Sequence, residues 1–80
     1  MQAPPLVPIR KLTPGQTARI ARLIGPPEDV HRLEELGLRQ GTTIQMFRPG
    51  NPCILRLEGS KVCLRAGKQI EVLVVPSLAP

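Results

Sequence analysis

The chain has 80 residues, which is enough for one small domain with a modest core. Its two cysteines are too few for a disulfide scaffold, and no apolar run approaches the roughly 20 residues that cross a bilayer. Three prolines among the first eight residues are incompatible with the apolar helical segment of a secretory leader. These features predict a soluble protein of a reducing, cytoplasmic environment.

The charge of the chain is unevenly distributed. The formal net charge is +5, yet four of the six acidic residues (Glu28, Asp29, Glu34 and Glu35) fall within eight positions. The sequence therefore predicts an acidic helix on a basic body. Aromatic residues are only 1% of the chain, whereas small basic domains usually stack bases on aromatic rings when they bind nucleic acid. We expect no nucleic-acid partner.

The N-terminal part of the chain predicts a proline-rich lead, a turn and a strand. Residues 1–9 are expected to be a flexible lead, and residues 76–80 a C-terminal tail. The turn is expected at residues 13–16, where Pro14 and Gly15 occupy the positions that a type II turn favours. A strand is predicted over residues 17–24, with a bulge near Ala21 because its alternation is imperfect.

A short helix is predicted after the Gly-Pro-Pro sequence at residues 25–27. Pro27 suits the first helical position, and acidic residues follow it in the first turn. Val30, Leu33 and Leu36 recur at helical spacing and form a narrow apolar stripe. Gly37 suits the left-handed residue that ends a helix. Because a helix of about ten residues is marginal in water, it is expected to pack on the β body.

Four further strands are predicted, over residues 42–48, 52–58, 61–65 and 70–75. Gly59 and Ser60 suggest a two-residue type II′ hairpin turn, since that turn has Gly first. This turn would pair Leu57 with Val62, Leu55 with Leu64, and Glu58 with Lys61. The fold class that follows is mainly β, a small SH3-like β-barrel of about five strands with one short α-helix.

The predicted hairpin separates the two cysteines. Cys53 has the parity of Leu55 and is expected to point inward, whereas Cys63 would lie opposite Arg56 on the outer face. Thiols on opposite faces of one sheet cannot form an internal disulfide.

Reactive groups are scarce. There is one histidine, no tyrosine or tryptophan, and no phosphate-binding Gly-Lys motif. A nucleophile–base pair of Cys63 and His31 has no third residue to orient it, so we expect no enzymatic activity. His31, Glu28 and Glu35 share one helical face and could bind a divalent ion such as Fe²⁺ or Zn²⁺, or could simply face solvent.

A protein-interaction surface remains as the main expectation. The acidic helix, the Gly-bounded sequence at residues 37–41 and the basic body together suggest a docking module. Phe47 is out of phase with its inward-facing strand neighbours, and it is either an exposed contact or a cap on the barrel end. The unpaired edges of a small barrel would also permit homo-oligomers.

Several sequence blocks together resemble the FeoA family, that of ferrous iron transport protein A. The blocks are LTPGQTARIARL (residues 12–23), RLEELGLRQGTTIQM (32–46), PCILRLEGSKVCLR (52–65) and IEVLV (70–74). Leu36-Gly37-Leu38 with Gly41-Thr42 matches the joint after the helix, and Gly59 with Leu64-Arg65 matches the close of the hairpin. The resemblance covers about residues 10–75.

The resemblance implies an SH3-like domain that assists FeoB, a membrane ferrous-iron permease with a cytosolic GTP-binding domain. It implies no catalytic residues, and membrane association only through that partner. We expect Leu36, Leu38, Arg39 and Phe47 to contact the partner. The module is also similar to the C-terminal domain of iron-dependent repressors, which leaves a transition-metal-binding regulatory domain as the alternative.

Overall fold

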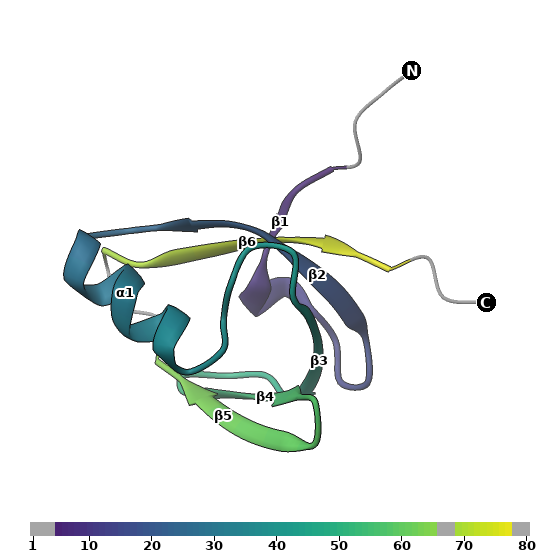
Figure 1. The fold of residues 1–80 in the computed structure, drawn as a ribbon. Helices are drawn as coiled ribbons and strands as arrows, with labels where there is room; N and C mark the ends of the chain where they lie inside the picture. Colours follow the sequence, from purple (N-terminus) through teal and green to yellow (C-terminus); the bar gives the residue numbers. More distant parts are fainter. Residues whose placement is uncertain (1–4, 66–68, 78–80) are drawn as a thin grey trace.

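The computed structural model describes residues 5–65 and 69–77, and shows one β-sheet with one α-helix (Figure 1). A 3₁₀ turn at Ile9–Lys11 follows the first strand, and α1 is Pro27–Glu35. The strands are β1 (Val7–Pro8), β2 (Thr17–Ile24), β3 (Thr43–Arg48), β4 (Cys53–Leu57), β5 (Ser60–Leu64) and β6 (Glu71–Pro76). No helix of the described residues is long and apolar enough to cross a membrane.

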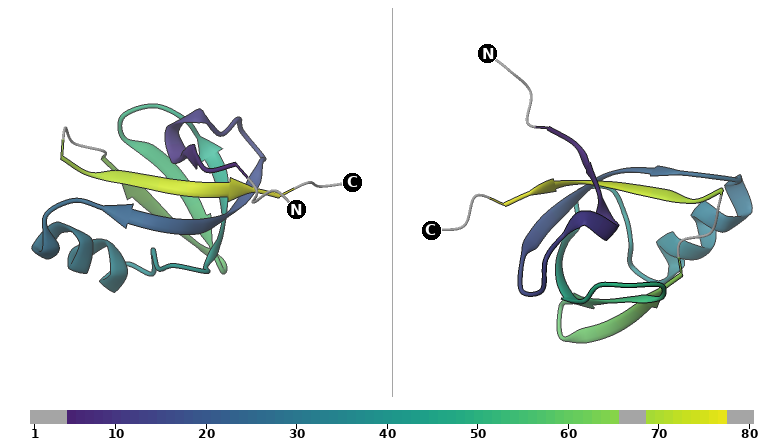
Figure 2. Two further views of the ribbon diagram at one scale, coloured as in Figure 1. Left: turned by 90° about the horizontal axis from the view of Figure 1, so that it is seen from above. Right: turned by 180° about the vertical axis from the view of Figure 1, so that it is seen from behind.

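The six strands are antiparallel and follow the order β1-β6-β2-β3-β4-β5. The sheet bends strongly, from β6 and β2 through β3 to β4 and β5, and α1 lies at the open side of the bend (Figures 1 and 2). The mainly β, SH3-like fold predicted from the sequence is confirmed. The sheet is not a strictly closed barrel, because β1 and β5 remain its two edges.

The N-terminal boundary of the domain lies earlier than the sequence suggested. Val7 pairs with Val74 of β6, and the Ile9 side chain is only 2% exposed. Residues 7–9 are therefore part of the fold and not of a flexible lead. Residues 1–4 of the expected lead, and 78–80 of the expected tail, lie outside the described residues, while Pro76 still belongs to β6.

The predicted turn and bulge at the first long strand are confirmed. The N–H of Gln16 donates a 3.0 Å hydrogen bond to the Thr13 carbonyl, and Gly15 has φ +87°, as the third position of a type II turn requires. In β2 the pairing with β6 shifts between Ile20 and Arg22. This bulge lets Arg19 and Arg22 both face outward and lets Leu23 pack against the core, which a strictly alternating strand would not allow.

Helix α1 begins and ends as predicted, but its apolar stripe is shorter. Pro27 is the first helical residue, and Gly37 has φ +102° directly after the helix. Leu33 is buried and Val30 is half-buried, whereas the Leu36 side chain is 50% exposed. The helix thus rests on the sheet mainly through Leu33.

The β4–β5 hairpin has a different turn from the predicted one. The two-residue turn is Glu58-Gly59, so Leu57 pairs with Ser60, and Leu55 pairs with Val62. Both turn residues have positive φ, +39° and +88°, which is the type I′ pattern rather than type II′. The predicted register is wrong by two residues. Because two is the side-chain period of a strand, every residue keeps its predicted face.

The predicted faces of the two cysteines are correct although the predicted register is wrong, because a shift of two residues leaves each side chain on the same face of the sheet. Cys53 is buried and pairs with Leu64, while Cys63 is exposed and pairs with Ile54 rather than Arg56. Both thiols are free.

The core lies inside the bend of the sheet. Its most deeply buried side chains come from three strands, the helix-to-β3 connection and the C-terminal strand: Ile20, Leu38, Ile44, Met46, Leu55 and Val74. No polar or charged residue among those described is buried. The interior is therefore purely apolar, and any recognition chemistry must lie on the surface.

Candidate functional site

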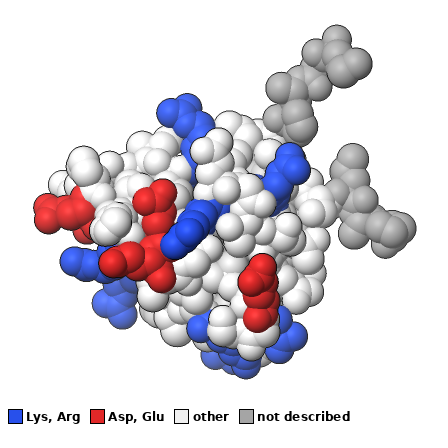
Figure 3. Space-filling model, in the orientation of Figure 1, with Lys and Arg blue, Asp and Glu red and all other residues white. Residues whose placement is uncertain are grey.

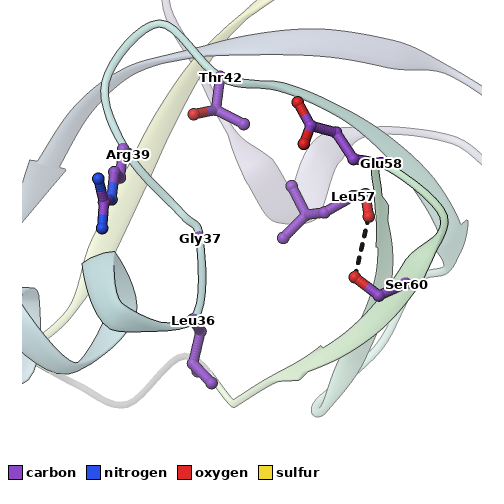
Figure 4. A pocket seen from close by; sticks show the side chains of 7 residues that line it. All are labelled: Leu36, Gly37, Arg39, Thr42, Leu57, Glu58 and Ser60. Carbon is purple, nitrogen blue, oxygen red and sulfur yellow. Dashed lines mark hydrogen bonds between the residues drawn. The ribbon is translucent and has the colours of Figure 1, made fainter.

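A groove of about 420 Å³ lies between the end of α1 and the β4–β5 hairpin. It is lined by Leu36, Gly37, Arg39, Thr42, Leu57, Glu58 and Ser60 (Figure 4). One wall comes from the helix-to-β3 connection and the other from the hairpin turn. The groove therefore joins segments that are about twenty residues apart in the chain, and it exists only in the folded domain.

The helix-side wall is fixed by the way α1 terminates. The N–H of Gly37 donates to the Glu34 carbonyl, and that of Leu38 donates to the Leu33 carbonyl, both at 3.0 Å. These two bonds form the Schellman motif. The Arg39 Nε also donates to the Glu34 carbonyl, at 3.1 Å, so a cation lies at the negative end of the helix dipole.

The hairpin-side wall is equally well defined. The Ser60 hydroxyl donates a 3.0 Å hydrogen bond to the Leu57 carbonyl across the two-residue turn (Figure 4). A Cβ added at Gly37 would lie 3.6 Å from Leu57 Cδ1, so a side chain at position 37 would bring the two walls into van der Waals contact at this point. The lining of the groove thus combines the apolar side chains of Leu36 and Leu57 with Arg39 and Glu58, one charge of each sign.

Three of the predicted partner-binding residues are on the surface and one is not. Leu36 and Arg39 line the groove and are exposed. The prediction for Leu38 is wrong, because its side chain is fully buried in the core. The Schellman turn reverses the chain at Gly37 and directs Leu38, rather than Leu36, toward Leu33 and the sheet.

Phe47 lies on a separate surface. Its ring is 44% exposed, which favours the exposed contact over the barrel cap. Lys61 Nζ is 4.1 Å from the ring centroid, and Arg56 Cζ is 5.7 Å from it. Lys and Arg side chains gather below the β4–β5 hairpin in Figure 3, whereas acidic side chains gather over α1. The predicted division between an acidic helix and a basic body is therefore present on the folded surface.

The predicted metal residues do not converge. His31 Nε2 lies 3.8 Å from Glu35 Oε2, and both side chains are exposed. In residues 5–65 and 69–77, no three His, Cys, Asp or Glu side chains are close enough to hold a metal ion. Glu28 does not complete the pair, since it precedes Glu35 by about two turns of the helix, or roughly 10 Å.

The buried thiol is chemically distinct from the exposed one. Burial raises the pKa of Cys53 above its ordinary value of 9.0, and the nearby Cys63 adds to the increase, while backbone hydrogen bonds at Cys53 and Leu64 oppose it. Cys53 is therefore a core residue in its neutral form and not a nucleophile.

The sequence did not identify Thr42, Leu57, Glu58 or Ser60 as site residues. Leu57 was expected only to fill the core, and the other three only to form a strand or a turn. No local signal marks them, because they become neighbours of Leu36 only when β4 and β5 fold back beneath the helix end.

Comparison with known proteins agrees with the fold. A search of curated proteins gives no match to this chain. A crystal structure described as that of an iron uptake regulatory protein (FeoA) superimposes with a TM-score of 0.81, at 24% identity, over 91% of this chain and 100% of the other. At this identity the likeness concerns the fold. The family model for the FeoA domain matches residues 7–76, which begin at β1 and end with β6. The chain therefore belongs to the FeoA family, the family of ferrous iron transport protein A.

Proposed function

We propose that this chain is a cytoplasmic, non-catalytic accessory protein of ferrous iron uptake. It binds the cytosolic GTPase domain of a FeoB-type permease. The observation that carries the proposal is the match of the FeoA family model to residues 7–76, from the first strand to the last. Membership of this family supports a role in ferrous iron transport, and the permease is the partner that the role implies.

The groove at the end of α1 is the surface that best suits this partner. It combines an exposed leucine, Leu36, with a charged rim of Arg39 and Glu58. An apolar anchor surrounded by polar groups is the usual composition of an interface centre. The groove is also built from hydrogen-bonded backbone on both walls, so little conformational freedom is lost on binding.

The buried residues of the described structure are apolar, so the proposal assigns partner recognition to the surface. Shifted pKa values and buried ionisable groups accompany most active sites. Here burial raises the pKa of the Cys53 thiol and so disfavours the reactive thiolate. The useful chemistry of the chain then lies in the shape and charge of its surface.

The alternative, a metal-binding regulatory domain, has weaker support. It would use His31 with Glu28 or Glu35, and the described structure unites only His31 and Glu35. Two exposed ligands on one helix leave most of the coordination sphere to water. We therefore retain the accessory protein as the conclusion.

Calorimetric titration of the purified GTPase domain with the full chain tests the proposal. The expected dissociation constant is about 1–50 μM, the range of transient complexes. Leu36→Asp and Arg39→Glu should each weaken binding about tenfold or more, because both alter the groove. Ile24→Asp is the matched control: Ile24 is 41% exposed on β2 and does not line the groove.

Two results would overturn different parts of the proposal. Absence of binding at the highest attainable concentration would reject the permease as partner. Binding that Leu36→Asp, Arg39→Glu and Ile24→Asp leave equally unchanged would keep the partner and reject the groove.

A further inference from the structure

Two cations face each other on the outer surface of the β4–β5 hairpin. Arg56 and Lys61 are directly paired in the register of the two strands, and like charges in that position destabilise a sheet. Neither forms an ion pair with a carboxylate within the described part of the chain. Both cations lie near the exposed ring of Phe47, and Lys61 Nζ is 4.1 Å from the ring centroid. An exposed cation–π contact is weak, so this positive charge is poorly compensated.

The bulge in β3 places a third cation beside them. Its pairing with β4 shifts between Met46 and Arg48, and both Phe47 and Arg48 are exposed. This surface, defined by Phe47, Arg48, Arg56 and Lys61, is named the basic face. Its composition favours an anionic ligand in contact with the outer side of β3, β4 and β5.

The open edge of the sheet at β5 indicates the form of that ligand. Strand β5 is an edge of the sheet, and within the described residues it pairs only with β4. In an antiparallel ladder the residues alternate between those that bond the neighbouring strand and those that do not. Because Ser60 pairs with Leu57 across a two-residue turn, Lys61 and Cys63 direct their N–H and C=O groups to the open side.

The open edge and the basic face meet at Lys61. We propose that β5 accepts an extended acidic segment of another protein, which adds an antiparallel or parallel strand to the sheet. Its backbone bonds the open groups of Lys61 and Cys63, and its outward carboxylates meet Lys61 and, one strand further in, Arg56. The flexible stem of Lys61 lets its ammonium turn from the Phe47 ring to a carboxylate beside β5.

Charge distinguishes this partner from a second copy of the chain. Pairing of two β5 edges would place two basic faces side by side, with Lys61 and Arg65 of each copy on the same side of the extended sheet. The repulsion disfavours that dimer, whereas an acidic strand neutralises the face. The proposal concerns a surface other than the groove, and it holds whether or not the permease binds there.

The test uses a synthetic peptide of about ten residues that alternates Glu and Thr, long enough for one strand. It is titrated into the full chain, and amide chemical shifts and peptide fluorescence anisotropy are recorded. We expect the Lys61 and Cys63 amides to shift most. Lys61→Gln should weaken binding about threefold, and the double variant Arg56→Gln/Lys61→Gln about tenfold. The control Arg22→Gln, an exposed cation on β2, should change binding less than about twofold.

The backbone part of the proposal is tested separately. Cys63→Pro removes an outward N–H without removing a bond to β4, and should weaken the peptide about tenfold. Because this variant can also destabilise the hairpin, the Glu/Thr peptide N-methylated at alternate residues is titrated into the unmodified chain. Equal affinity of the methylated and unmethylated peptides would overturn strand addition.

Three further outcomes would reject the acidic segment as the occupant. The first is equal binding of a Lys/Thr peptide, and the second is self-association of the chain with shifts confined to β5. The third is sedimentation with phosphatidylglycerol vesicles without binding of the Glu/Thr peptide, which would assign the basic face to a lipid surface.

Discussion

The backbone N–H of Leu38 donates a 3.0 Å hydrogen bond to the carbonyl of Leu33, across the residue at which the helix ends. Both leucine side chains are buried in the same core. This bond reverses the chain within one turn, sends Leu38 inward and leaves Leu36 at the groove. The same helix termination therefore places Leu38 in the core and Leu36 at the groove.

Gly37→Ala should destabilise the domain by about 1–2 kcal/mol, because φ +102° is unfavourable for a residue with a Cβ. Space is not the obstacle, since the added Cβ would lie at an ordinary 3.6 Å from Leu57. Urea denaturation measures the loss. Gly37→Asn should lose less, since Asn tolerates left-handed backbone better. An alanine variant as stable as wild type would show that the helix does not end as described.

Leu38→Ala should cost about 2–5 kcal/mol of unfolding free energy, as expected for a fully buried leucine. The matched substitution Leu36→Ala should cost less than about 0.5 kcal/mol, because that side chain is half exposed. Chemical denaturation of both variants gives the comparison. Similar losses at the two positions would contradict the different burial of these residues.

Glu58→Asn should stabilise the domain by about 0.5–1 kcal/mol, because it creates the Asn-Gly pair that type I′ turns favour at positive φ. Glu58→Gln removes the same charge, but glutamine does not favour positive φ as asparagine does. This variant should therefore be no more stable than wild type. Thermal unfolding of the three proteins distinguishes them. A gain in the glutamine variant as large as in the asparagine variant would assign the effect to charge instead.

The raised pKa of Cys53 predicts loss of stability at alkaline pH. The unfolded thiol ionises near its ordinary value of 9.0, whereas the folded one ionises at a higher pH. Its contribution is therefore complete below pH 9 and is lost as pH rises through the folded pKa. Unfolding free energies of wild type and Cys53→Ala, measured from neutral pH upward, should converge as the pH passes this range. A constant difference would contradict the prediction.

Alkylation with iodoacetamide separates the two thiols under native conditions. Cys63 is exposed and Cys53 is buried, so one equivalent should react quickly and the second only on unfolding. Cys63→Ser should abolish the fast phase, and Cys53→Ala should leave it intact. Rapid reaction of both thiols in the folded protein would contradict the described hairpin.

Titration with Zn²⁺ tests the exposed pair on α1. Wild type and His31→Ala should differ in affinity by less than about tenfold, because His31 and Glu35 supply at most two ligands. Glu34→Ala, next to the pair in sequence, serves as the control. A larger loss in His31→Ala alone would restore the metal-binding alternative.

Local signals in the sequence identified most of the elements. Pro27 and Gly37 mark the limits of α1, and the irregular alternation around Ala21 marks the bulge in β2. The faces of Cys53 and Cys63 were also correct. Each of these features depends on neighbours within a few residues, where backbone preferences and side-chain parity act directly.

The sequence alone determined the fold class, the division of charge between helix and sheet, and the family resemblance. Only the tertiary structure decided that Leu38 is buried, that Val7 extends the sheet, and that the hairpin turns at Glu58-Gly59. These three outcomes depend on contacts between distant segments, and shifts of two residues in a hairpin leave the sequence pattern unchanged. The groove beside Leu36 and the cation pair against Phe47 arise in the same way, because packing and not local preference brings their residues together.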